Sequence, residues 1–169
     1  MVKCIGAACI VSACIGAGIT IVTNHKKEVN SLKNLILAID YMESELQFCM
    51  PSLPVLCQKT AGQCDKNLKK LFLNLAFELE GQVAPDVKHC MESALCKSVD
   101  IPDKTQKCLE LLGDSLGKFD LDGQLKALEQ VKISCEEKLN QLLENANVRL
   151  RSYQTLGLCL GAALIILLV

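Results

Sequence analysis

Cysteine is the residue type with the most evident chemical potential in this chain, because 11 of its 169 residues are cysteines. No two of them are spaced as Cys-x-x-Cys, and their number is odd. A zinc ribbon or a thioredoxin-like motif is therefore not supported. Cysteine also behaves as a small apolar residue that is commonly buried. The sequence predicts mostly buried, reduced thiols at Cys4, Cys9, Cys14, Cys49, Cys57, Cys64, Cys90, Cys96, Cys108, Cys135 and Cys159.

His89 lies beside Cys90, with Cys96 six residues later, and this group could form a thiol site or a partial metal site. The helical pattern of the segment instead predicts an exposed His89 and buried thiols. Acidic pairs such as Glu43 and Glu45 do not share one helical face, as paired acid and base catalysis would need. The chain also lacks a phosphate-binding GxxxxGK(S/T) loop. We expect no enzyme activity and no cofactor.

The composition favours one helical domain. Half of the residues are hydrophobic, but only 4% are aromatic and none is Trp. A core filled by leucine, alanine and cysteine favours helices over sheets. The formal net charge of -1 gives no electrostatic reason to expect nucleic-acid binding.

Spacing and turn residues predict about six helices. The first continues to about Gln47, with an inward stripe at Val29, Leu32, Ile36, Ile39, Met42, Leu46 and Cys49. Ser52 is expected to cap a second helix that ends near Gly62, and Asp65 to cap a third that ends at Gly81. A fourth helix ends near Ser98, and a fifth runs from Pro102 or Asp103 through Leu112. Residues 113–120 are then expected to connect to a last helix capped by Asp120, with apolar positions at Leu121, Leu125, Leu128, Val131, Cys135, Leu139, Leu142 and Ala146.

Two uncharged apolar segments predict membrane anchors at the ends of the chain. The first, Cys4 to Thr23, has 20 residues without a charge, which as a helix of about 30 Å matches the hydrocarbon core of a bilayer. The second, residues 153–169, is shorter, so tilt or bilayer thinning must absorb the difference. We therefore expect an anchor at 1–23, a cytoplasmic helical bundle at 24–152 and an anchor at 153–169.

Two other interpretations of the first segment have less support. A signal peptide has an apolar region of only about 7 to 15 residues that ends at a cleavage site, whereas apolar residues continue here past Gly16-Ala17-Gly18. Val11-Ser12-Ala13-Cys14 resembles a bacterial lipoprotein box, and processing there would give an outward-facing lipoprotein. The residues after Cys14 are apolar, however, and do not form the polar tether that usually follows a lipidated cysteine.

Small residues four positions apart would allow the two anchors to approach each other closely. The candidates for this membrane helix packing are Ser12, Gly16, Gly157 and Gly161. Basic residues predict the orientation: three lysines follow the first segment, while Arg149 and Arg151 precede the second. The positive-inside rule then places residues 24–152 in the cytoplasm, where thiols stay reduced.

Four segments carry a resemblance to a known family. They are the start MVKCIG, the helix end MESEL before Leu53-Pro54, the segment LLGDSLGKFDLDGQLKAL and the terminal YQTLGLCLGAALIILLV. With them, the chain resembles the stage III sporulation protein AB family of endospore-forming bacteria over essentially its full length. The third segment is the most specific, through Leu112, Gly113, Leu116, Gly117, Asp120, Gly123 and Gln124.

The resemblance implies a component of the mother-cell half of the channel complex that connects mother cell and forespore, in the mother-cell membrane that faces the forespore. It also implies a likeness to the cytoplasmic domains of F-type platform proteins of type II secretion and type IV pilus systems. Those domains are helical bundles beside a motor ATPase. The implied partners are the secretion-type ATPase, stage III sporulation protein AA, and other membrane subunits, and a homo-oligomer is possible.

The expected fold is all-α, a cytoplasmic antiparallel bundle whose first and last helices extend into the membrane. The expected function is that of a non-enzymatic membrane platform that docks the ATPase. The alternative is a membrane-anchored thiol redox or metal sensor.

Two groups of residues are candidates for contact with a partner. In the family-matched segment, Gly113 and Gly117 would let the chain turn between helices, and Gly123 early in a helix costs about 1 kcal/mol relative to alanine. This segment is interpreted as a docking surface or as a structural corner with Gln124 bonded inside it. The second candidate is a basic patch formed by Lys66, Lys69 and Lys70.

Overall fold

The computed structural model describes the backbone of residues 2–81, 86–98, 100–118 and 120–168, and the side chains of residues 23–81, 86–98, 100–118 and 120–144. Within these ranges the chain forms six α-helices and no strands, which confirms the predicted all-α fold. The helices are α1 (Val2–Phe48), α2 (Leu53–Gln63), α3 (Lys66–Glu80), α4 (Val87–Lys97), α5 (Asp103–Ser115) and α6 (Leu121–Leu168).

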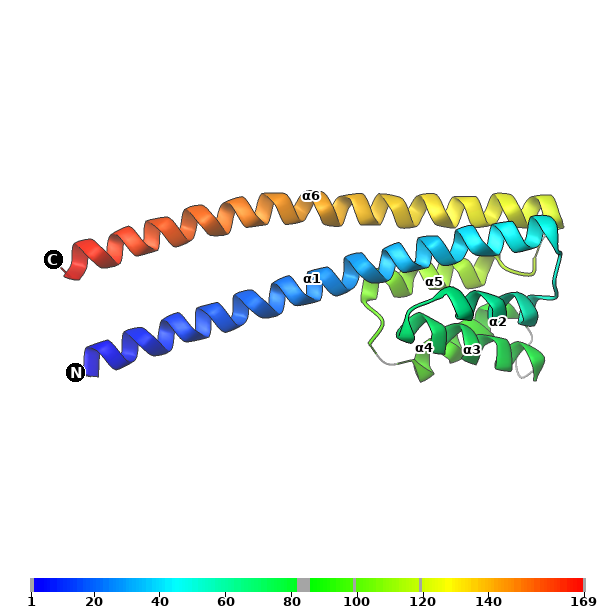
Figure 1. Ribbon diagram of the computed structural model, residues 1–169, viewed down its shortest axis with the longest axis horizontal. Helices are drawn as coiled ribbons and strands as arrows, with labels where there is room; N and C mark the ends of the chain where they lie inside the picture. Colours follow the sequence, from blue (N-terminus) through cyan, green and yellow to red (C-terminus); the bar gives the residue numbers. More distant parts are fainter. Residues whose placement is uncertain (1, 82–85, 99, 119, 169) are drawn as a thin grey trace.

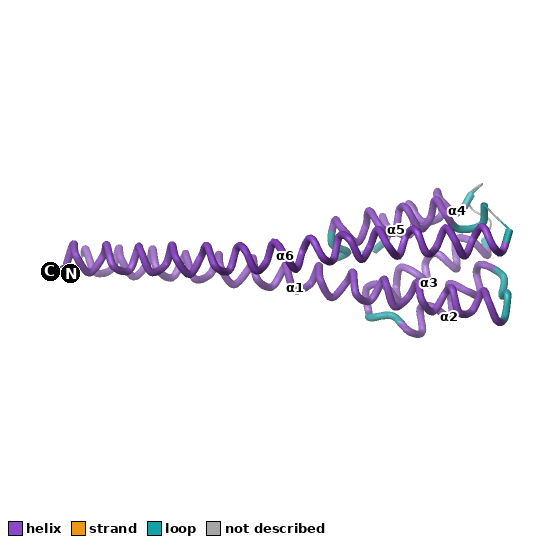
Figure 2. The backbone as a smooth tube through the Cα atoms, turned by 90° about the horizontal axis from the view of Figure 1, so that it is seen from above, coloured by secondary structure: helices purple, strands orange, loops and turns teal. Residues whose placement is uncertain are grey.

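The long helices α1 and α6 form the frame of the molecule (Figure 1). They pack against each other and extend in the same direction past the four short helices, so both chain ends lie at one end (Figures 1 and 2). Helices α2 to α5 pack at the opposite end. We call residues 24–144 the head, and the extensions 2–23 and 145–168 the arms.

The two ends of the head differ in the helices that begin there. Helices α3 and α5 begin at the end from which the arms leave, which we call the arm-side end (Figure 1). Helices α2, α4 and α6 begin at the other end, which we call the corner end. This alternation arises because each short connection reverses the direction of the chain, as in an antiparallel bundle.

The predicted helix starts are confirmed in position, but two of the predicted caps are wrong. Ser52 and Asp65 precede α2 and α3, and neither side chain makes a capping hydrogen bond. The Asp65 carboxylate instead accepts a hydrogen bond from the side-chain amide of Asn34 in α1. A tertiary contact has replaced the local one. In α4 the cap is present, since Asp86 Oδ1 accepts from the His89 backbone N–H at 2.9 Å.

The apolar stripes of the long helices meet in one core that α2 to α5 complete. Phe72 of α3 is among its largest fully buried side chains. Two residues of the inward-facing stripe predicted for α1 are not fully buried. Ile36 is only partly buried, and Cys49 is exposed because α1 ends at Phe48. The buried residues of α1 and α6 are Val29, Leu32, Leu35, Ala38, Ile39, Met42, Leu46, Leu128, Val131, Cys135 and Leu142.

Polar contacts also join α1 and α6 along the head. The Lys132 ammonium of α6 contacts the Asp40 carboxylate and lies 3.9 Å from Glu43, both in α1. Nearer the arms, the His25 ring Nε2 lies 3.0 Å from the carbonyl oxygen of Leu142. These contacts fix the register of the two long helices where they leave the head.

Among the residues whose side chains are described, no helix is long and apolar enough to cross a membrane. The predicted anchors, 1–23 and 153–169, lie outside those residues except for Thr23. The same holds for the predicted membrane packing residues Ser12, Gly16, Gly157 and Gly161.

Candidate functional site

Gly113 lies inside α5, which continues to Ser115, so its predicted position in the connection to α6 is wrong. The residue is buried against α4: a Cβ atom placed on it would lie 2.7 Å from Met91 Cβ. Real Cβ atoms essentially never approach so closely. Glycine is therefore needed here so that α4 and α5 can pack in direct contact, and this packing keeps the helix intact despite the low helix propensity of glycine.

Gly117 is the residue at which the chain turns toward α6, as predicted. Its φ of 77° lies in the left-handed region, which glycine adopts without the steric cost that a Cβ brings. A Cβ here would lie 3.0 Å from Val87 Cγ2 and 3.6 Å from Leu53 Cδ2. The turn therefore closes over the first residues of α2 and α4, and it belongs to the corner end of the head.

Asp120 caps α6, which confirms the prediction. Its carboxylate Oδ1 accepts from the Gly123 backbone N–H at 3.2 Å, and its carbonyl accepts from the Gln124 N–H at 2.8 Å. The side chain of Gln124 is half-buried and makes no hydrogen bond to another described residue. Residue 119 of the same corner lies outside the described residues, so the bonding of Gln124 inside the corner stays a prediction.

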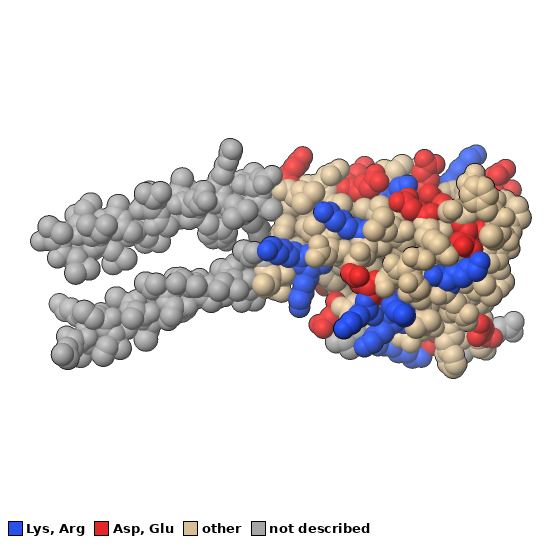
Figure 3. Space-filling model, viewed as in Figure 1, with Lys and Arg blue, Asp and Glu red and all other residues tan. Residues whose placement is uncertain are grey.

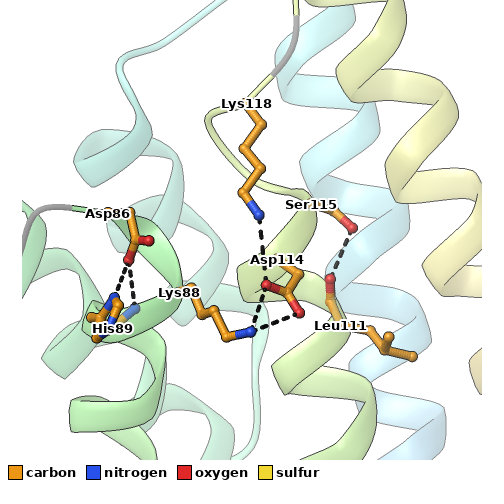
Figure 4. A network of polar contacts seen from close by, with 7 residues as sticks. All are labelled: Asp86, Lys88, His89, Leu111, Asp114, Ser115 and Lys118. Atoms are coloured by element: carbon orange, nitrogen blue, oxygen red, sulfur yellow. Dashed lines mark hydrogen bonds and ion pairs between the residues drawn. The ribbon is translucent and has the colours of Figure 1, made fainter.

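A polar network ties α4 to the end of α5 at the corner end (Figure 4). The Lys88 ammonium of α4 lies 3.2 Å from Asp114 Oδ1, and Lys118 lies 3.6 Å from the same oxygen. The hydrogen bond from Lys88 lowers the pKa of Asp114 and raises the pKa of Lys88. Beside the network is a surface hollow of about 380 Å³ lined by Lys88, Met91, Glu92, Glu110 and Asp114.

His89 and Asp86, in the same view, form an exposed pair whose stability contribution should depend on pH. The ring Nδ1 lies 2.6 Å from Asp86 Oδ1, and this hydrogen bond raises the pKa of His89. A raised folded-state pKa stabilises the protein below the unfolded-state pKa of histidine, and the contribution is lost as the pH rises through the folded-state pKa. We expect His89→Gln to lower the melting temperature at about pH 6 and to have little effect at about pH 9.

Thermal melts of wild type and His89→Gln across this pH range would test the expectation. The variant keeps the backbone N–H that donates to Asp86, so the helix cap is retained. A difference in melting temperature that is the same at every pH would contradict the proposed origin of the effect.

The basic patch is exposed on the first turns of α3, at the arm-side end. Lys66, Lys69 and Lys70 form no ion pair with any described residue. Lys66 lies on the rim of a hollow of about 500 Å³ between α1 and α3, and Lys70 on a neighbouring hollow of about 300 Å³. Figure 3 shows basic side chains gathered at this end of the head. The two groups predicted to contact a partner therefore lie at opposite ends.

Comparison with known proteins identifies the family. The family model for stage III sporulation protein AB matches residues 3–169. The chain belongs to the stage III sporulation protein AB family. A solved structure titled stage III sporulation protein AB is similar, with a TM-score of 0.62 and 19% sequence identity; the match covers 72% of this chain and 98% of that one. No curated protein matches the sequence.

Family membership confirms the predicted link to sporulation, and the structural match supports the helical fold. The family match spans both arms and the head, so the corner and the basic patch both lie inside the matched region. In this family member the glycines of the corner have clear packing and turn roles, at Gly113 and Gly117 respectively. Exposed polar side chains, including those of Lys88, Asp114 and Lys118, lie near them.

The seven cysteines with described side chains in this family member are free thiols. Burial raises the pKa of Cys57 to about 12 and that of Cys64 to about 11. The pKa of Cys108 is lowered, because Cys135 donates a hydrogen bond to it and the Lys138 ammonium lies 3.4 Å away. Four of these thiols are buried, namely those of Cys57, Cys90, Cys108 and Cys135. The thiol of Cys64 is partly buried, and those of Cys49 and Cys96 are exposed.

The predicted group of His89, Cys90 and Cys96 does not come together as one site. His89 is exposed, as expected, and it pairs with Asp86. Cys90 is buried, but Cys96 is exposed, so its predicted burial is wrong. Within the described residues, no three His, Cys, Asp or Glu side chains are placed to hold a metal ion. The thiol or metal sensor stays a prediction, and Cys4, Cys9, Cys14 and Cys159 lie outside the described residues.

One charged residue of the described core was missed in the sequence. Glu78 of α3 is only 3% exposed. Its carboxylate accepts hydrogen bonds from the Lys97 ammonium and from Ser93 Oγ, both in α4, and the bond from Lys97 lowers the pKa of Glu78. The signal was present, since Glu78 follows the buried Leu71 by seven residues and so lies on the same face. It joins α3 to α4.

Proposed function

We propose that this family member is a non-enzymatic membrane platform of the mother-cell channel complex and docks a secretion-type ATPase, stage III sporulation protein AA. The observation that carries the proposal is the arrangement of α1 and α6. Both helices leave the same end of the head, and both chain ends lie beyond it (Figures 1 and 2). A protein held by both arms presents its head on one side of the attachment.

The arms are proposed to be the attachment to the membrane. Within the proposed anchors 1–23 and 153–169, residues 4–23 and 153–169 carry no charged side chain, and they belong to the two helices that extend past the head. The lysines after the first segment and the arginines before the second support a cytoplasmic head, with the anchors in the mother-cell membrane that faces the forespore. Close packing of the anchors through Ser12, Gly16, Gly157 and Gly161 belongs to the same proposal.

The corner end is proposed to meet the ATPase, because it lies farthest from the arms. Buried contacts of Gly113 and the turn at Gly117 give it a fixed shape. Its polar side chains are open to solvent, since those of Lys88, Asp114 and Lys118 are between 41% and 48% exposed. A rigid surface loses little conformational entropy on binding, and its exposed charged groups can make the binding specific for one partner.

Co-purification of the ATPase with two charge-reversal variants would test this assignment. In the first, Lys118→Glu and Lys126→Glu reverse two exposed lysines near the start of α6. In the matched control, Lys66→Glu and Lys70→Glu make the same charge change at the arm-side end. We expect recovery of the ATPase to fall about tenfold for the first variant only, which corresponds to a loss of about 1.4 kcal/mol.

Both variants must first be shown to remain in the membrane fraction and to keep the wild-type helical content. Unchanged recovery with the corner variant would remove the corner end as the docking surface. A wild-type protein that is absent from the membrane fraction would instead refute the anchoring part of the proposal.

A further inference from the structure

Lysines that lack an ion pair are concentrated at one end of the head. Lys59, Lys88, Lys97, Lys118 and Lys132 each lie within 4.0 Å of a carboxylate. Lys138 donates to Cys108. The remaining described lysines make no ion pair or hydrogen bond with a described residue; they are Lys26, Lys27, Lys33, Lys66, Lys69, Lys70, Lys104, Lys107 and Lys126. All but Lys126 belong to segments at or next to the arm-side end.

These lysines come from three separate parts of the sequence. They lie on the segment of α1 that follows the arm, in the first five residues of α3 and in the first five residues of α5. The fold brings the three segments together, because α3 and α5 both begin where the arms leave the head (Figure 1). Residues 24–34, 65–70 and 100–107 carry eight lysines against four carboxylates, whereas the whole chain has a net charge of -1. The arm-side end is therefore basic on a slightly acidic protein.

The surface at this end is also hollowed. Three neighbouring hollows, of about 500, 300 and 280 Å³, all include Asp100 in their lining. Lys27 and Lys66 lie on the first, and Asn24 of α1 lies on the third. Asp65 takes part in the first as well, but its carboxylate already accepts from Asn34. The hollows bring lysine and amide donors to one furrowed face, where the carboxylates of Glu28, Asp100 and Asp103 also lie.

We propose that this arm-side surface docks on the anionic headgroups of the bilayer that holds the arms. The inference rests on the proposed function, because it requires the arms to be membrane anchors. The apolar segment of α1 ends at Thr23, and the next residues, Asn24 and Lys27, line the hollows. A membrane that holds this segment must begin beside the lysine surface, so a protein partner would have to enter between head and bilayer.

Docking would give the lysines of α3 and α5 a role that the anchors alone do not provide. Basic groups near an anionic leaflet are attracted to it over about one Debye length, roughly 8 Å at physiological salt. The arms fix only one edge of the head, along α1 and α6. Contacts from α5, and from α3 on the side away from the long helices, would stop the head from tilting, so that the corner end points away from the membrane.

Amine footprinting of the full-length protein in nanodiscs would test the proposal. Acylation rates of individual lysines would be compared by mass spectrometry in purely zwitterionic phosphatidylcholine and in the same lipid with about one third phosphatidylglycerol. We expect Lys66, Lys69 and Lys70 to react at least about threefold more slowly in the anionic discs. The negative surface potential lowers by about that factor the fraction of nearby amines that is in the neutral, reactive form. Lys126 should react equally in both, and high salt should abolish the difference.

The two charge-reversal variants described above provide the control. In the Lys66→Glu and Lys70→Glu variant, the protection of Lys69 by anionic lipid should disappear, while recovery of the ATPase stays at the wild-type level. In the Lys118→Glu and Lys126→Glu variant, Lys69 should remain protected.

Equal reactivity of the α3 lysines in the two lipid compositions would overturn the proposal. So would protection of Lys69 that depends on added ATPase and not on lipid charge, because the surface would then meet a protein. Failure of the proposed function gives a different result: the wild type either does not enter nanodiscs, or enters them and recovers no ATPase.

Discussion

Replacement of Phe72 by alanine is expected to lower the free energy of unfolding by about 3–5 kcal/mol. Phe72 is fully buried in α3, in the core that α1 to α6 share. Loss of its ring removes apolar contacts and leaves a cavity that the surrounding helices can only partly close. Urea denaturation of the full-length protein in detergent, followed by circular dichroism, would measure the loss.

Phe77, in the same helix, offers a matched control. It lies five residues after Phe72, and it is 72% exposed. The same substitution there should change the free energy of unfolding by no more than about 0.5 kcal/mol. Similar losses in the free energy of unfolding for Phe72→Ala and Phe77→Ala would contradict the structure, in which Phe72 faces the core and Phe77 faces solvent.

A second large effect is expected at Gly113, where alanine should destabilise the protein by about 1–3 kcal/mol. The new Cβ would lie 2.7 Å from Met91 Cβ, an atom attached directly to the backbone of α4. Because that atom cannot rotate away, α4 and α5 would have to separate. The gain in helix propensity from glycine to alanine, about 1 kcal/mol, is not enough to offset this separation.

Gly62 in α2 is the control for this second prediction, because a Cβ there would meet no atom within 4 Å. Gly62→Ala should therefore stabilise the protein by about 0.5–1 kcal/mol, through better helix propensity and a less flexible unfolded chain. Denaturation of the two variants under identical conditions would show the opposite signs. A gain in stability for Gly113→Ala would refute the close packing of α4 against α5.

If the corner end docks the ATPase, the Gly113 substitution should have a second consequence. Separation of α4 and α5 moves Lys88 away from Asp114, and so alters the surface that we propose meets the partner. The Gly62 substitution leaves that surface unchanged, since Gly62 is near the arm-side end of α2. Stability and docking are therefore linked at the corner through the packing of one glycine.

Much of the secondary structure could be predicted because local signals decide it. Apolar residues repeat at three and four positions in α1 and α6, and this pattern requires helices whatever the rest of the chain does. Pro51 follows the end of the first helix and Pro54 lies in the first turn of α2, while Asp86 and Asp120 cap α4 and α6 through bonds that span only three residues. The positive φ of Gly117 follows from the same local logic, because the chain must turn there.

Three departures from the local sequence pattern share a different origin, because a contact from another helix decided each of them. Gly113 looked like a helix end, yet Met91 of α4 packs on it and α5 continues. Asp65 looked like a cap, but Asn34 of α1 binds its carboxylate. Glu78 was not singled out in the sequence, and Lys97 and Ser93 of α4 make its burial favourable. None of these partners is near in sequence.

The sequence by itself determined that the chain is all-helical, that its apolar segments lie at its two ends and that it resembles the sporulation family to which it belongs. Only the tertiary structure decided which residues are neighbours on the surface. The corner and the basic patch are separated to opposite ends, and lysines from α1, α3 and α5 gather at one of them. The reason is physical: helical periodicity is set by neighbours within one turn or two, whereas the position of a helix end depends on how several helices bury their apolar faces together.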